Sequence, residues 1–308
     1  MDNNHSCVRV DMKPTDYVAG DGHIVLGAVP PVLSGDWSPY YEFFERQMLN
    51  SGDSESCVLF TTQQAMDSQV EQQIQSGVIS AQTVAWFDSL GYMDVGADGK
   101  KHFHSSPRWL AALTGNGLRG NNVVDGWDVL RKFGALPYKD FPVDPTLTPQ
   151  QFVDATAITQ AMKNKGQQFL LGVGGKNFVQ YHWLLNGTDN FQATISPLQY
   201  SPLCDGVNVG SDWNEVNPVP PASGANPGHC VGRIKDVLPL TAVEYDHYMP
   251  NPKNLINYPI AYSLQAIVTI TPPPPAPLPP PNPTPVQAST WLQKLVTWLQ
   301  TILTTVQN

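Results

Sequence analysis

Basic residues are scarce in this chain. It has 17 Lys and Arg against 26 Asp and Glu among 308 residues, and its net charge is −9. The basic residues form no run or stripe, whereas binding the phosphates of a nucleic acid requires clustered cations. The composition therefore argues against a nucleic-acid partner.

Long apolar stretches are also absent. No uninterrupted apolar run reaches the roughly 18 residues that a membrane-spanning helix needs. The first residues, Met-Asp-Asn-Asn-His, lack the basic segment and the apolar core of a signal peptide. We therefore expect neither a transmembrane span nor a secretory signal.

Cysteine is too rare for a disulfide scaffold in a chain of this length, and no Cys-x-x-Cys pair suggests structural zinc. The four cysteines are Cys7, Cys57, Cys204 and Cys230. His102 and His104 offer two ring nitrogens but have no apparent third ligand, which favours a solvated loop. We expect no metal ion and no cofactor.

Helical patterns dominate residues 37–150. Apolar residues recur at multiples of four after Ser56, which predicts a helix capped by Ser56 and ended by Gly77. A second helix is predicted over 123–133 and a third over 151–165. This part of the chain reads as a helical lobe that contains the candidate nucleophile.

Short apolar or alternating runs separated by Gly, Pro and Asn replace the helical pattern from about residue 168. They are typical of an antiparallel sheet. Because helices come first and strands second, the sequence predicts the α+β class, with a β lobe over 151–270. The predicted strands cover 169–173, 191–195, 230–234, 243–245 and 258–270.

The two ends differ from the rest. Residues 1–36 read as an irregular arm, either a pro-segment or an edge strand. Residues 271–286 form a proline-rich linker, for which we expect semi-rigid polyproline II structure. An amphipathic helix is predicted over 287–308, because apolar residues between 288 and 306 follow a heptad pattern. For this helix we favour self-association or protein docking, and a membrane-surface role stays open.

Cys57 differs from the other cysteines because it stands at a predicted helix start, after the turn-like run 51–56. A cysteine nucleophile works as the thiolate, and the positive end of a helix dipole lowers the pKa of a thiol. A buried structural cysteine is the alternative interpretation.

His229 is the candidate base for such a thiolate. It lies in a Pro-Gly-His turn that leads into a predicted strand, and Asp246 follows at the end of the next strand. Adjacent strands would bring the two side chains together, so that Asp246 accepts a hydrogen bond from the ring and fixes its tautomer.

This order of a cysteine on a helix, then a histidine and an acid on strands, resembles the papain-like cysteine peptidases. The matching segments are Ser56-Cys57-Val58 and Gly228-His229-Cys230, while Asp246-His247-Tyr248 stands where these enzymes place Asn-Ser-Trp. The Trp that follows their cysteine is absent here. The resemblance implies a two-lobe fold with Cys57, His229 and Asp246 as the catalytic set, and with Tyr248 shielding the His–Asp hydrogen bond.

The resemblance also implies an oxyanion donor and a substrate-binding loop. Gln47 lies ten residues before Cys57 and is the favoured donor, with Asn50 or no side chain as alternatives. Gly120 and Asn121 lie in a segment that resembles the Gly-rich stretch whose backbone pairs with extended substrate. A simple loop-to-helix turn explains that segment equally well.

An ordered set of motifs is most similar to papain-like domains encoded by tailed bacteriophages and spans roughly residues 36–270. Because no signal peptide is visible, we expect the host cytoplasm or a virion as the location, which the sequence does not decide further. The heptad pattern within 288–306 favours self-association or docking on a virion or host protein. The motifs are the segments 36–40, 45–47, 57–58, 103–108, 129–134 and 258–264.

The function predicted from the sequence is a thiol endopeptidase that acts on a protein or an extended peptide. One alternative is an inactive papain-fold module with a structural or attachment role in a phage particle. Another is a peptidoglycan-cleaving hydrolase, although those enzymes have a much shorter interval from Cys to His than the 172 residues found here.

Overall fold

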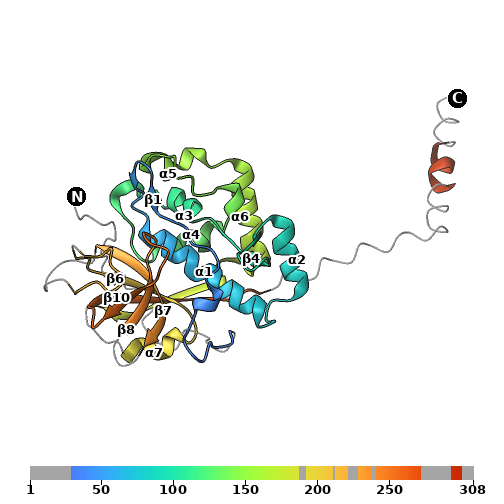
Figure 1. The fold of residues 1–308 in the computed structure, drawn as a ribbon. Coiled ribbons are helices and arrows are strands. Elements are labelled where there is room, and N and C mark those ends of the chain that lie inside the picture. Colours follow the sequence, from blue (N-terminus) through green and yellow to red (C-terminus); the bar gives the residue numbers. More distant parts are fainter. Residues whose placement is uncertain are drawn as a thin grey trace. The chain divides into compact units, whose positions relative to one another are not determined.

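The computed structural model describes residues 29–186, 192–210, 212–220, 228–237, 241–271 and 293–299 (Figure 1). The chain divides into two compact units, one ending at Pro272 and the other starting at Pro273. The helices and strands that build the fold and the candidate site all lie in the first unit.

The first unit combines helices with an antiparallel sheet. The helices are α1 (Cys57–Gln75), α2 (Ala81–Leu90), α3 (Pro107–Thr114), α4 (Asp125–Phe133), α5 (Pro149–Phe152), α6 (Gln160–Gly172) and α7 (Gln192–Leu198). The strands are β1 (Met48–Leu49), β2 (Gly52–Asp53), β3 (Met93–Val95), β4 (Lys101–Phe103), β5 (Val179–Asn186), β6 (Leu203–Val207), β7 (His229–Val237), β8 (Thr241–Tyr245), β9 (Lys253–Ile256) and β10 (Ile260–Val268).

Helix α1 confirms the helix predicted after Ser56. Ser56 occupies the N-cap position, although its hydroxyl donates to the carbonyl of Ser54 instead of accepting from the helix. Gly77 follows the last turn with φ of 75°, a conformation that glycine adopts without the penalty of a Cβ. Nearly all of α1 is buried, so this helix runs through the core rather than along the surface.

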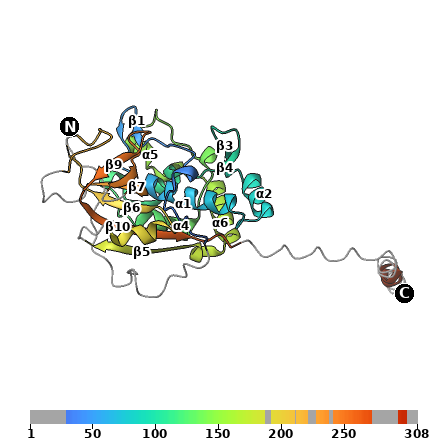
Figure 2. The ribbon, with the colours of Figure 1, turned by 60° about the horizontal axis from the view of Figure 1, so that its bottom comes forward.

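The six-stranded sheet has the order β5-β10-β6-β7-β8-β9, and all neighbouring strands are antiparallel. Figures 1 and 2 show α1 between this sheet and the other large helices. Glutamine side chains join the two: Gln73 donates to the carbonyl of Val268 at 2.8 Å, and Gln69 accepts from its N–H at 2.9 Å. These bonds satisfy polar groups that burial would otherwise penalise.

Two predicted strands are wrong. Residues 169–172 lie in the last turns of α6. This helix starts at Gln160 and is capped by Thr159, whose hydroxyl accepts from the N–H of Met162. Leu171 is 74% exposed beside buried Phe169 and Leu170, a pattern of one helix face. The helix predicted over 151–165 is therefore displaced towards the C-terminus, and helices continue past residue 150.

The second misread strand is 191–195, because Gln192–Leu198 form helix α7. Thr194 and Leu198 are buried and lie four residues apart, as one helix face requires. The strands predicted over 230–234, 243–245 and 258–270 are confirmed by β7, β8 and β10, and the helix over 123–133 by α4.

The chain ends are described in part. Val32 is buried in a cluster with Trp37 and Leu198, and its N–H donates to the carbonyl of Gln199 at 2.7 Å, so the end of the predicted arm packs against the fold. Residues 1–28 of the predicted arm and the proline-rich linker from 272 lie outside the described residues. Residues 293–299 are helical, and the rest of the helix predicted over 287–308 also lies outside them.

Gly134 provides a test of helix packing. It has φ of 75° and ψ of −179°, and a Cβ there would lie 2.1 Å from the carbonyl oxygen of Gly166 on α6. Gly134→Ala is expected to destabilise the fold by about 2–4 kcal/mol, because backbone strain adds to the clash.

Gly115 is the matched control for that substitution. Its φ is 73°, but nothing lies within 4 Å of the position that an added methyl group would take, so Gly115→Ala should cost only about 1 kcal/mol in urea denaturation. Equal losses for the two variants would contradict the close packing of α4 on α6.

Candidate active site

The start of α1 packs against the start of β7, and this contact brings Cys57 towards His229. Thr61, one turn after Cys57 on the same helix face, donates its hydroxyl to the carbonyl of Cys230 at 3.4 Å. Cys57 and His229 are each 1% exposed. The structure thus joins, in one buried region, two residues that the sequence separates by 172 positions.

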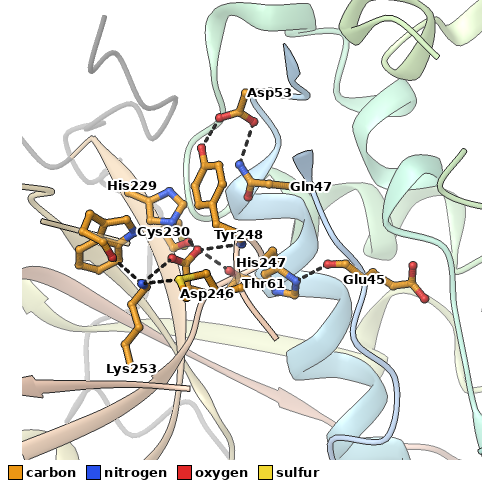
Figure 3. A network of polar contacts seen from close by, with 12 residues as sticks. Glu45, Gln47, Asp53, Thr61, His229, Cys230, Asp246, His247, Tyr248 and Lys253 are labelled. Carbon is orange, nitrogen blue, oxygen red and sulfur yellow. Dashed lines mark hydrogen bonds and ion pairs between the residues drawn. The ribbon is translucent and has the colours of Figure 1, made fainter. Parts of the chain in front are cut away.

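His229 and Asp246 form the hydrogen bond predicted from the sequence. The ring Nε2 of His229, the first residue of β7, lies 3.0 Å from Oδ1 of Asp246, the residue that follows β8 (Figure 3). Burial raises the pKa of Asp246, but the charge and hydrogen bond of His229 and the charge of Lys253 outweigh it, so the pKa is lowered. Asp246 is therefore a carboxylate that accepts from the imidazole.

Tyr248 lies against the imidazole, as the resemblance implied. Its ring centroid is 5.1 Å from that of His229, and its N–H donates to Asp246 Oδ1 at 3.2 Å. Trp213, which the sequence analysis did not identify, places its ring edge-on to His229 at 5.6 Å. The two aromatic rings thus enclose the imidazole and limit access of water to its bond with Asp246.

Asp53 connects Tyr248 with Gln47 (Figure 3). The Tyr248 hydroxyl donates to Asp53 Oδ2, and the Gln47 amide donates to Oδ1 at 2.9 Å. Burial, then the Asp53 carboxylate, and then charge at Cys57 raise the pKa of the Tyr248 phenol far above its usual range, so it stays a donor.

Hydrogen bonds of both its backbone and its side chain fix the position of Gln47. Its backbone N–H donates to the carbonyl of His247 at 3.0 Å, and the His247 ring Nδ1 donates to the carbonyl of Glu45 at 2.9 Å. Burial lowers the pKa of His247 to about 4, so this ring is neutral near pH 7. The structure places Gln47 in the network around Asp53, whereas Asn50 is exposed.

Gly120 and Asn121 lie at the end of a 3-10 turn over Gly117–Arg119. Gly120 has φ of 82°, and the buried Asn121 accepts from the side chain of Asn116 at 3.1 Å within its own loop. Their role in binding substrate stays a prediction.

His102 and His104 are buried, so the expectation of a solvated loop is wrong. His104 lies between Asp94 and Glu45 at 3.0 Å each and stacks on Phe43. His102 lies within reach of Asp98, and these two and Glu42 have ligand atoms within 4.8 Å of one another. Hydrogen bonds between these two imidazoles and nearby carboxylates thus hold the β3–β4 hairpin in place.

His104 should make stability depend on pH. Burial lowers the pKa of His104, but its bond to Glu45 and the charges of Asp67 and Glu45 outweigh this, and the pKa is raised. Its contribution is therefore complete below the unfolded pKa near 6.5 and is lost as pH rises through the folded pKa. His104→Gln should flatten this loss in urea denaturations between pH 5 and about 9. An unchanged profile would argue that His104 is neutral.

None of the helices in the described part of the chain has the length and apolar character to cross a bilayer.

Solved structures show what this fold is similar to. Xylellain, a cysteine protease from Xylella fastidiosa, aligns over 87% of this chain and 96% of its own, with a TM-score of 0.53 and 16% identity. Procathepsin B S9 from Trypanosoma congolense aligns over 87% of each chain, with a TM-score of 0.53 and 10% identity. Procathepsin L 3 of Tenebrio molitor covers 86% of this chain at a TM-score of 0.51 and 12% identity.

No protein-family model matches the sequence, and no curated protein matches it either. The structural likeness therefore rests on the arrangement of helices and strands rather than on shared sequence. At these identities it establishes the fold, and the fold of this chain is that of the papain-like cysteine proteases.

Proposed function

We propose that the chain is a papain-like cysteine peptidase, with Cys57 as nucleophile, His229 as base and Asp246 as the residue that orients the base. The supporting observation is the contact of Thr61 on α1 with Cys230 on β7, which packs the helix that starts at Cys57 against the strand that starts at His229, whose ring is bonded to Asp246. A helix start favours the thiolate, and the carboxylate stabilises the imidazolium that forms beside it.

In this mechanism His229 accepts the proton of the Cys57 thiol, and the sulfur attacks the carbonyl carbon of the substrate. The peptide C–N bond breaks as His229 returns the proton to the leaving amine. Water then attacks the thioester, with His229 taking its proton, and the acid product leaves as Cys57 regains the proton. The substrate we propose is a protein or extended peptide along Gly120 and Asn121.

The test is covalent labelling by an epoxide inhibitor of papain-like enzymes, read by intact mass and peptide mapping. Selective single labelling of Cys57 that disappears in His229→Ala is expected, because only Cys57 would be activated by the imidazole. No labelling, or equal labelling of all four cysteines, contradicts the proposal. A version lacking residues 1–36 checks whether the arm blocks the reagent.

Gln47 is the proposed oxyanion donor, and it has a close control. Gln47→Ala should lower kcat by on the order of 10²–10³, the effect of losing one such donor. Asn50→Ala removes the alternative donor and should leave kcat nearly unchanged. The opposite result in a peptide-hydrolysis assay would reassign the role to Asn50, and small effects of both would indicate that no side chain has it.

A non-catalytic module is the second candidate, because the donor amide of Gln47 is engaged by Asp53 and Cys57 is 1% exposed. It would have a structural or attachment role in a phage particle, and it predicts an ordered protein whose cysteines all react alike. A peptidoglycan-cleaving activity would instead appear in a lytic assay on cell walls. For the C-terminal helix we propose self-association or docking on a virion or host protein.

A further inference from the structure

Lys253 is a buried cation beside the proposed catalytic pair. It is the first residue of β9 and is 1% exposed. Its Nζ lies 3.5 Å from Asp246 Oδ2, the oxygen that does not face His229 (Figure 3). A lysine is almost never fully buried unless it is paired, so this position requires an explanation.

The other contacts of the Lys253 Nζ are those of an ammonium. It donates to the carbonyl of Trp213, to the carbonyl of Glu215 at 3.2 Å and to the sulfur of Met249 at 3.6 Å. These three acceptors match the three N–H groups of the charged form and exceed the two of a neutral amine. The Nζ also lies 5.1 Å from the centre of the Trp213 ring, a favourable place for a cation.

Asp246 depends on this cation. His229 and the N–H of Tyr248 both bind Oδ1, while Oδ2 is buried without a hydrogen bond in the described part of the chain. The Lys253 ion pair is therefore the compensation for Oδ2. Without Lys253, the full negative charge of the buried Asp246 carboxylate would act on the imidazole of His229.

We propose that Lys253 is a positioning residue that neutralises Asp246, so that His229 is oriented by a carboxylate without being held permanently as an imidazolium. The assignment rests on the proposed function of His229 as a base. The same ammonium attaches the backbone of residues 213–215 to the pair, which places the Trp213 ring beside the imidazole.

The charged and titratable groups around Asp246 are consistent with its neutralisation by Lys253. Burial lowers the pKa of Lys253, and the charge of Asp246 opposes that effect. The other charged or titratable groups around the pair act on different members of the site. His247 and Tyr248 after β8 interact with Asp246, Asp212 and Glu215 before β7 interact with Lys253, and Cys57 on α1 and Asp53 on β2 interact with Tyr248. Among these described neighbours, Lys253 is the fixed cation.

A double-mutant cycle tests whether the charges of Lys253 and Asp246 act on His229, separately from any effect on the stability of the fold. The four proteins are the natural chain, Lys253→Met, Asp246→Asn and the double variant. The readout is the NMR titration midpoint of the His229 ring protons, assigned by their loss in His229→Gln. Where peptide hydrolysis is measurable, the alkaline limb of its pH–rate profile gives a second readout.

The single variants should shift the midpoint in opposite directions. Lys253→Met leaves Asp246 uncompensated and should raise the midpoint by about one pH unit, whereas Asp246→Asn leaves the ammonium unpaired and should lower it by a similar amount. The double variant should return near the natural value. Shifts of one sign, or shifts that do not cancel, would show that Lys253 only supports the loop.

Two controls keep the outcome decisive. Lys253→Arg retains the charge and should retain the midpoint. If Lys253→Met does not fold, Lys253→Gln removes the charge but keeps donors for the two carbonyls, and the cycle is read with it. Failure of the peptidase proposal would appear separately, as unselective labelling of Cys57, while the titration cycle still decides the role of Lys253.

Discussion

Cys57→Ser is expected to reduce peptide hydrolysis by on the order of 10⁴-fold or more, the scale seen when a covalent nucleophile is removed. A serine hydroxyl is far less acidic than a thiol, so the imidazole of His229 does not convert it into a nucleophile to the same extent. Initial rates on a denatured protein substrate, with the variant purified free of host peptidases, measure the change.

Cys204→Ala is the control for that loss. Cys204 is as buried as Cys57 but lies on β6, which is a strand of the sheet rather than the start of α1. Its substitution should leave kcat within a few-fold of the natural value. If Cys57→Ser kept the natural rate, the measured hydrolysis would not come from this site.

Arg233→Ala is expected to destabilise the fold by about 3–5 kcal/mol, the cost of breaking a buried ion pair. Arg233 on β7 is fully buried, and its guanidinium donates to Asp205 Oδ2 from Nε at 2.7 Å and again from Nη2. Burial, followed by the charge of Asp205, raises the pKa of Glu244 well above its usual range. The substitution would leave the buried Asp205 carboxylate without its bonded cation.

Urea denaturation of Arg233→Ala and Arg131→Ala compares a buried pair with an exposed one. Arg131 on α4 lies 3.9 Å from Asp128, and both side chains are partly exposed. Its loss should cost at most about 1 kcal/mol. Similar losses for the two variants would mean that Asp205 takes up a proton when Arg233 is absent, which a steeper pH dependence of stability would reveal.

Local sequence patterns were sufficient where a residue's neighbours along the chain set its structure. The spacing of apolar residues after Ser56 and the glycine at 77 predict α1, and the short apolar or alternating runs at 230–234 and 258–270 correspond to β7 and β10. The same local reasoning failed for 169–173 and 191–195, because short apolar runs fit a helix or a strand equally well. For residues 169–173, the cap at Thr159 and the packing of one buried face stabilise the helix α6.

The candidate site follows the same division. The sequence by itself determined the chemical types and their order, since Cys57 at a helix start, His229 at a strand start and Asp246 after the next strand are local features. Only the tertiary structure decided which charges surround them. Lys253 and Trp213 meet the His–Asp pair through contacts between segments 40 residues apart, and no periodicity in the sequence encodes a contact of that kind.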